Sequence, residues 1–208
     1  MNQEVYNVVS EYDPTVYEFL NDGPKGLIRK VIYYQEIRKD IFNLSFGDWE
    51  AENERNNDRR RTNNLDRDKV LATVASTVID FMSNHPNATI IVKGSTSSRT
   101  RLYQMGINAN LPEIQRLFKI FGYFNDNWEP VEAGKNYIQF VLRLNKIVNL
   151  ITKKIEMAIK IKEGKPTNII RVKKMRDYSK DPIFIKKAEE ASKFIDEHPL
   201  PDSFMKKS

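Results

Sequence analysis

The chain has 208 residues, 40% of them hydrophobic and 30% charged, which is ordinary for a globular protein with one sizeable core. It holds no cysteine and only two histidines, His85 and His198, so we expect no disulfides, no metal, no cofactor and no histidine-based triad. Without a run of about 18 apolar residues or an evident secretory signal, the expected location is cytoplasmic, away from membranes.

Positive charge is concentrated in the last quarter of the chain. Residues 1–148 carry 19 basic and 19 acidic residues, whereas residues 149–208 carry 15 and 9, so 15 minus 9 gives the whole net charge of +6. Such asymmetry predicts two units with different roles. We expect a domain over 1–148, a linker over 149–156 and a basic tail over 157–208.

The first elements alternate in hydrophobicity like strands. We expect strands over 15–20, 25–34 and 41–47, joined by short turns as an antiparallel meander. Residues 50–64 then contain one aliphatic side chain and no aromatic one, and are expected to form a solvated loop or the exposed start of a helix. Arg59, Arg60 and Arg61 in this stretch fit a charged loop better than a nucleic-acid patch, because acids precede them.

An apolar stripe at helical spacing then predicts a helix over 66–84 that ends at His85 and Pro86. The stripe consists of Val70, Leu71, Val74, Val78, Phe81 and Met82. The elements expected after it are a strand over 88–93, helices over 97–109 and 111–117, and strands over 119–124 and 136–143. The order predicts an α+β fold, with a mostly antiparallel sheet and helices packed on one face.

The stretch from Lys93 to Tyr103 is where the sequence proposes a site. A strand that enters a helix through small residues points backbone N–H groups at one spot, which favours an anion. The anion-binding candidates are Lys93, Gly94, Ser95 and Thr96. The alternative is a structural capping turn in which the hydroxyls only satisfy the helix start.

Four residues are candidates for catalysis, namely Arg99, Arg101, Tyr103 and Asp48. Arginine grips phosphate or carboxylate bidentately, while a carboxylate or tyrosine moves a proton. On a regular helix Arg99 and Tyr103 share a face and Arg101 points about 200° away from Arg99. Both arginines therefore reach one ligand only if Arg99 lies in the turn. The alternatives are a turn-capping role for Asp48 and a core position for Tyr103.

Several phrases resemble an uncharacterised bacterial family of the Bacteroidetes type, a domain of unknown function, over about residues 10–145. They are Gly23-Pro24-Lys25-Gly26, Asn43-Leu44-Ser45-Phe46-Gly47-Asp48, Asn63-Asn64-Leu65-Asp66-Arg67-Asp68-Lys69-Val70, and Gly94-Ser95-Thr96 with Arg99-Thr100-Arg101-Leu102-Tyr103. The resemblance implies a fold unit and no assigned chemistry.

The tail resembles a second gene product. Met157 opens a pattern typical of a translation start and a short basic strand, and Asp181-Pro182 then predicts the start of an amphipathic helix. The apolar stripe of that helix is Phe184, Ala188, Ala191 and Ile195. So small a strand-helix appendage needs a partner surface, which is the first domain, a second subunit or an external partner.

Two functions follow. The first is a toxin-like effector domain that acts on RNA or a nucleotide and is silenced by an antitoxin-like tail. The second is a non-enzymatic binding module whose tail drives oligomerisation or nucleic-acid contact. We expect a homo-oligomer in either case, and whether the protein is an enzyme stays open.

Overall fold

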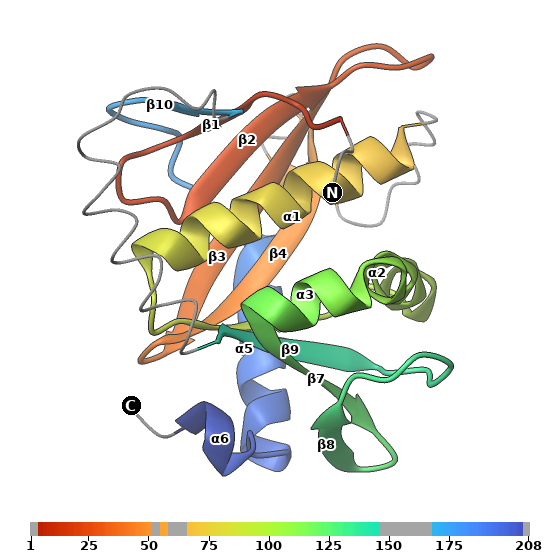
Figure 1. The fold of residues 1–208 in the computed structure, drawn as a ribbon. Coiled ribbons are helices and arrows are strands. Elements are labelled where there is room, and N and C mark those ends of the chain that lie inside the picture. Colours follow the sequence, from red (N-terminus) through yellow and green to blue (C-terminus); the bar gives the residue numbers. More distant parts are fainter. Residues whose placement is uncertain (1–3, 51–54, 58–65, 146–167, 206–208) are drawn as a thin grey trace, which may run out of the picture.

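The computed structural model describes residues 4–50, 55–57, 66–145 and 168–205. It confirms the α+β class, with one mostly antiparallel sheet in the strand order β10-β1-β2-β3-β4-β6-β9-β7-β8 and with β5 paired to the end of β4 (Figure 1). The strands are β1 (Val8–Ser10), β2 (Val16–Asn21), β3 (Ile28–Arg38), β4 (Ile41–Glu50), β5 (Arg55–Asn57), β6 (Thr89–Val92), β7 (Phe118–Phe124), β8 (Asn127–Pro130), β9 (Gln139–Leu144) and β10 (Ile169–Arg171).

The helices cover both faces of this sheet. On one face lie α1 (Arg67–Asn84), α2 (Ser97–Ala109) and α3 (Leu111–Leu117), while α5 (Pro182–Glu197) and α6 (Asp202–Met205) lie on the other. Figure 1 shows α1 crossing the sheet in front and α5 behind it. The helices of the first 145 residues are thus on one face, as predicted, and those of the tail are on the opposite face.

Strands β2, β3 and β4 form the predicted antiparallel meander. Strand β4 then leads through α1 to β6, which pairs with it in parallel, because a crossover helix returns the chain to the same edge. Strand β9 pairs antiparallel with both β6 and β7. This arrangement sets the start of α2 just beyond the end of β6.

Two apolar layers follow from the alternation of side chains along the strands. On the α1 face, Ile32, Tyr34, Phe42 and Ile90 pack with Phe81 of the helix. On the opposite face, a layer that includes Ile41, Ile91 and Val141 of the strands packs with Ile195 and Phe204. The C-terminal segment therefore supplies one side of the second layer.

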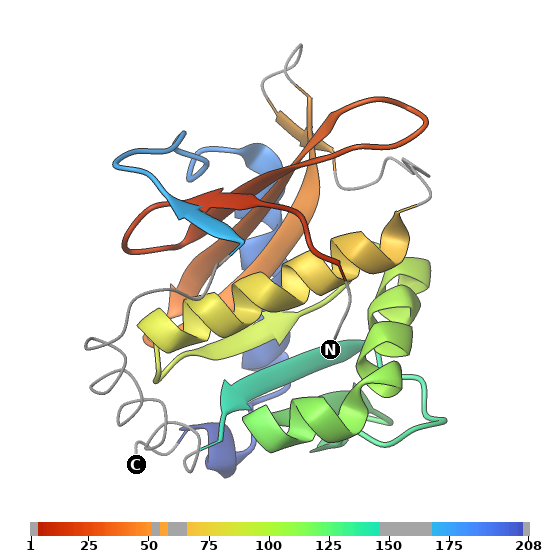
Figure 2. The same ribbon diagram turned by 45° about the horizontal axis from the view of Figure 1, so that its top comes forward.

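The tail joins the sheet edge as well as its face. Strand β10 pairs in parallel with β1, and the two lie side by side in Figure 2. Helix α5 begins where the sequence predicts, because Asp181 Oδ1 accepts hydrogen bonds from the amides of Ile183 and Phe184 at 2.9 and 3.3 Å.

Some expectations from the sequence differ from the structure. Residues 55–57 form the short strand β5 where a loop or a helix start was expected, and β1, β8 and α6 were not anticipated. Arg59, Arg60, Arg61, the linker 149–156 and the region of Met157 lie outside the described residues. The separation into a domain over 1–148 and a tail stays a prediction.

Candidate functional site

An apolar cavity lies between the first three helices and the sheet. Its volume is about 390 Å³, within the range of about 300–1,000 Å³ typical of small-molecule pockets. Aliphatic side chains of β4, β6, β7 and β9 line its floor, including Leu44, Val92, Ile120 and Leu142. Its walls come from α1, α2 and α3, with Leu71, Val74, Val78, Leu102, Ile107, Ile114 and Leu117.

The mouth of the cavity also exposes apolar atoms to solvent. Ile79 of α1 and Met105 of α2 both line it and are 42% and 55% exposed. Gly106 also lines the cavity, and a Cβ at that position would be in ordinary contact with Leu71 Cδ1 at 3.7 Å. Exposed apolar groups at the rim of a concave site are typical of a place where a ligand binds.

Few polar groups line this cavity, namely Arg67, Asp68, Tyr103 and Asn110. Arg67 Nε donates to Asp68 Oδ1 at 2.9 Å, and both side chains are more than half exposed. Such a surface pair contributes little to stability, so the guanidinium is available to a ligand at small cost.

The carboxylate of the preceding residue, Asp66, serves a structural role. It accepts hydrogen bonds from Tyr6 Oη at 2.7 Å and from Asn21 Nδ2 at 2.9 Å. Burial, together with this bond to a carboxylate, raises the pKa of Tyr6 to about 12. Asp66 thus ties the start of α1 to the chain before β1 and to the end of β2.

The predicted anion site at the start of α2 consists of residues that bind one another. Thr96 is the N-cap, and its Oγ1 accepts from the amide of Arg99 at 3.3 Å. Ser95 Oγ accepts from Arg99 Nη1 at 3.1 Å, and the amide of Gly94 donates to Thr100 Oγ1 at 3.0 Å. These contacts are those of a capping turn.

The structure separates Lys93 from this turn. Its ammonium lies 5.5 Å from the ring centroid of Phe194 in α5, on the sheet face opposite α2. Arg99 is half-buried in the first turn of α2, and Arg101 is exposed, so the two arginines lie on different faces of one helix. Tyr103, which shares a face with Arg99, lines the apolar cavity.

Asp48 lies in β4 and is 6% exposed. It forms an ion pair with Lys30 of β3, its cross-strand neighbour. A buried pair in this register holds two strands in place, and Asp48 is not among the residues that line the cavity.

The four tail residues predicted to bind a partner form the buried face of α5. Phe184 packs edge-on against Tyr33 of β3 at 5.2 Å between ring centroids, and Ile195 packs with Ile41 and Ile91. Ala188 and Ala191 lie between them, where their small side chains let the helix approach the sheet closely.

Sequence reasoning found the walls of the cavity without finding the cavity. The stripe over 66–84 includes Leu71, Val74 and Val78, which were expected to be core and are only partly buried. The signals were Ile79 and Met105, two large apolar residues at solvent-facing positions. Among the described residues, no group of three or more His, Asp or Glu side chains is placed to hold a metal ion.

The chain belongs to a family described as a family of unknown function (DUF6934), whose model matches residues 2–145. This match confirms the predicted membership of an uncharacterised family. Comparisons with curated proteins and with solved structures found no match. In the part of the chain that the structure describes, no helix has the length and apolar character needed to cross a membrane.

Proposed function

We propose that this member of a family of unknown function is a non-enzymatic binding module that holds a small apolar molecule between α1, α2, α3 and the sheet. The observation that carries the proposal is the cavity of about 390 Å³ with its almost wholly aliphatic lining. The sheet floor makes the site concave, which suits a small molecule better than the flat face of another protein.

The lining also sets the class of ligand. Aliphatic walls with a few polar groups at the rim fit a molecule with an apolar body and one polar end. Burying about 250 Å² of apolar ligand surface at about 25 cal/mol per Å² gives a gross gain of about 6 kcal/mol. The costs of association make the net gain smaller than this gross gain, so we expect dissociation constants of about 0.1–1 mM.

The test is binding of an uncharged fluorescent probe, N-phenyl-1-naphthylamine, to the full chain. We expect saturable fluorescence enhancement and displacement by decanol and decanoic acid. Ala75→Phe and Gly106→Leu place side chains into the cavity and should weaken probe binding at least tenfold. The matched control is Ala133→Phe, since Ala133 is exposed in the loop after β8.

Two results would contradict the proposal. One is an absence of saturable binding up to millimolar probe, which would make the cavity a loosely packed part of the core. The other is equal loss of binding in Ala133→Phe and Ala75→Phe.

A comparison of decanol with decanoic acid shows whether Arg67 at the rim favours an anionic end of the ligand, and Arg67→Met should remove that preference.

A second candidate function is the effector acting on RNA or a nucleotide with an antitoxin-like tail. The observation that favours it is the packing of α5 onto the sheet through its four buried residues. Because α5 lies on the face opposite α2, the tail would restrain the domain through the sheet and not by covering Arg99. The effector function would reside in the family-matched region and the tail would restrain it.

Growth of a bacterial host of the Bacteroidetes type tests this second candidate. A full-length variant with a loosened tail helix, Phe194→Ala, should slow growth, and Arg99→Ala in the same background should restore it. Normal growth of cells that contain the Phe194→Ala variant at matched protein levels would contradict the effector function. If growth stays slow after Arg99→Ala is added, Arg99 is not part of the effector site.

A further inference from the structure

The tail helices cover a part of the sheet with an unusual set of side chains. On β7 and β9 and just beyond the end of β6, the side facing α5 and α6 carries three cations, two aromatic rings and one amide. We call this set the covered face, and it consists of Lys93, Lys119, Phe121, Tyr123, Gln139 and Arg143.

Two of the cations lie directly opposite each other. Lys119 of β7 and Arg143 of β9 are cross-strand partners, and like charges in that position destabilise a sheet. Both turn to Phe204 of α6. Arg143 Nη1 donates to its carbonyl oxygen at 3.0 Å, and the Lys119 ammonium lies 5.5 Å from its ring. A phosphate is a stronger partner for such cations than a carbonyl oxygen, because its hydrogen bonds are charge-assisted at both ends.

Each aromatic ring of the covered face also packs against an aromatic ring of the tail. Tyr123 packs edge-on against Phe194 at 5.0 Å, and Phe121 packs edge-on against Phe204 at 5.2 Å. Phe121 and Tyr123 are two residues apart on β7, so their side chains project in the same direction. Paired aromatics on a sheet are the platform on which RNA-binding domains stack bases.

The amide of Gln139 adds an independent observation. The residue is 1% exposed, and neither its Nε2 nor its Oε1 has a hydrogen-bond partner. It is the cross-strand partner of Tyr123 and lies next to the strand end that holds Lys93. A buried amide without partners is costly and calls for an explanation. An amide beside a stacking ring can read the edge of a base.

The segment that lies on the covered face has the opposite charge. Residues 182–205 contain three lysines and five acids, a net charge of −2 within an otherwise basic tail. The carbonyl oxygen of Phe204 and the rings of Phe194 and Phe204 contact the cations and aromatic rings of the covered face. We propose that the covered face is a binding site for single-stranded RNA, and that α5 and α6 occupy it in competition with RNA.

This site would be the place of RNA contact for the second candidate function, and it does not involve the apolar cavity. Since the tail and RNA compete, the apparent association constant for RNA is the intrinsic constant multiplied by the fraction of molecules in which the covered face is open. Binding through the three cations of the covered face should also depend on salt, with a slope of log K against log salt of roughly −2.

Fluorescence anisotropy with a labelled twelve-nucleotide oligouridine at low salt tests the inference on full-length chains. The double variant Phe194→Ala and Phe204→Ala removes the two tail rings that pack on the covered face and should bind at least tenfold more tightly than the natural chain. Ile185→Ala is the matched control, because it shortens a side chain on the exposed side of α5. It should leave affinity unchanged.

Single charge changes then locate the site. Lys93→Met and Arg143→Met, each added to the double variant, should weaken binding at least fivefold, whereas Arg116→Met on α3 should not. Lys93→Met and Arg143→Met also remove contacts between the sheet and the tail. If RNA binds elsewhere on the chain, these two changes should leave RNA binding unchanged, or strengthen it where the tail blocks that other site. Unchanged or strengthened binding would therefore overturn the inference, and so would a result in which only Arg101→Met weakens binding.

If the double variant fails to fold, the natural chain is instead crosslinked to an oligouridine that contains 4-thiouridine. Crosslinks in peptides of β7 and β9 would support the inference, and crosslinks confined to 97–105 would overturn it. An absence of both binding and crosslinking at 100 µM RNA also overturns it. RNA binding without an effect on host growth would leave this inference intact and remove only the effector function.

Discussion

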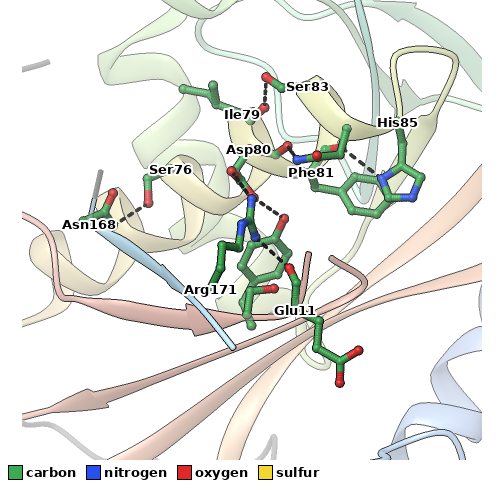
Figure 3. A network of polar contacts seen from close by, with 12 residues as sticks. Glu11, Ser76, Ile79, Asp80, Phe81, Ser83, His85, Asn168 and Arg171 are labelled. Carbon is green, nitrogen blue, oxygen red and sulfur yellow. Dashed lines mark hydrogen bonds and ion pairs between the residues drawn. The ribbon is translucent and has the colours of Figure 1, made fainter. Parts of the chain in front are cut away.

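Arg171 of β10 donates from Nη2 to both carboxylate oxygens of Asp80 in α1, each at 2.7 Å. The same arginine donates from Nη1 to the carbonyl oxygen of Glu11 at 3.1 Å, and Tyr17 Oη donates to Asp80 Oδ2 at 2.7 Å (Figure 3). A residue beyond the family-matched region is therefore fixed to the main helix of that region. The network makes the sheet edge and α1 depend on the tail.

The first prediction is that Asp80→Asn and Arg171→Met each lower the free energy of unfolding by about 2–3 kcal/mol, because each leaves a partly buried charged partner unsatisfied. The double variant should lose less than the sum of the two. Urea unfolding followed by circular dichroism measures all four chains of this cycle. Strict additivity would show that the two side chains do not interact in solution.

The second prediction concerns the close contact between β6 and α2 at Gly94. A Cβ there would be 2.4 Å from the amide nitrogen of Thr100 and 2.8 Å from the Cβ of Arg99. Gly94→Ala should therefore destabilise the protein by about 1–3 kcal/mol, as overpacking does. Gly26→Ala is the control, since the φ of Gly26 is +81° and a Cβ built there would have no atom within 4 Å.

That control separates crowding from backbone strain. Gly26→Ala should cost only about 1 kcal/mol, the cost of placing alanine at positive φ. The midpoint of urea unfolding measures both variants. A smaller loss for Gly94→Ala than for Gly26→Ala would mean that the start of α2 shifts to accommodate the methyl group.

The sequence predicted elements best where periodicity or a cap defines them. Helices α2 and α3 have the predicted bounds, and Asp181 caps α5 as expected. Strand β8 was missed because the two-residue turn Asn125-Asp126, with φ of 46° and 57°, returns the chain at once into a strand of only four residues. Strand β10 is the short strand expected in the tail, whereas β1 has only three residues and is defined by pairing, which no local pattern records.

The candidate site was harder to predict because it depends on what packs against what. Lys93 and Arg99 are six residues apart, yet a strand end and a helix start direct them to opposite faces of the sheet. Asp48 is paired across two strands with Lys30. The cavity arises where α2 and α3 do not fully cover the stripe of α1, and such incomplete packing leaves no mark in hydrophobic periodicity.

The third prediction is a pH dependence around Glu129. The hydrogen bond from the Lys135 ammonium, aided by one from Tyr137, holds the pKa of the Glu129 carboxyl below its usual value despite partial desolvation, and the same partner raises the pKa of Lys135. Because the folded pKa of Glu129 is lowered, its contribution to stability is present above the unfolded pKa and is lost as pH falls through the folded pKa.

Lys135→Met should therefore reduce stability at pH 6 and change it progressively less as pH falls through the folded pKa of the carboxyl, below which the carboxyl is protonated in both states. Carbon-detected NMR titration of the Glu129 carboxyl should also show its midpoint rise in this variant. Lys39→Met, at an exposed position in the turn before β4, is the control. An unchanged midpoint in Lys135→Met would show that the pair is not formed in solution.

The fourth prediction is that a chain ending at residue 145 does not fold as the full chain does. The truncated chain lacks Phe184 and Ile195, and burial of each of these side chains contributes about 2–3 kcal/mol to the free energy of unfolding. With Ala188 and Ala191 included, the total loss is about 5–7 kcal/mol. A domain has only about 5–15 kcal/mol of stability. The loss also exposes Tyr33, Ile91 and Val141, so the truncated chain should self-associate and exchange its β3 and β4 amides rapidly.

Hydrogen exchange and size-exclusion chromatography measure this outcome, and a chain ending at residue 205 is the control. Addition of a peptide spanning 168–205 should restore part of the amide protection, because the docking surface on β3 and β4 is still encoded. A truncated chain that is monomeric and unfolds cooperatively at the temperature of the full chain would show that the tail is an accessory. The family-matched region would then be a folding unit by itself.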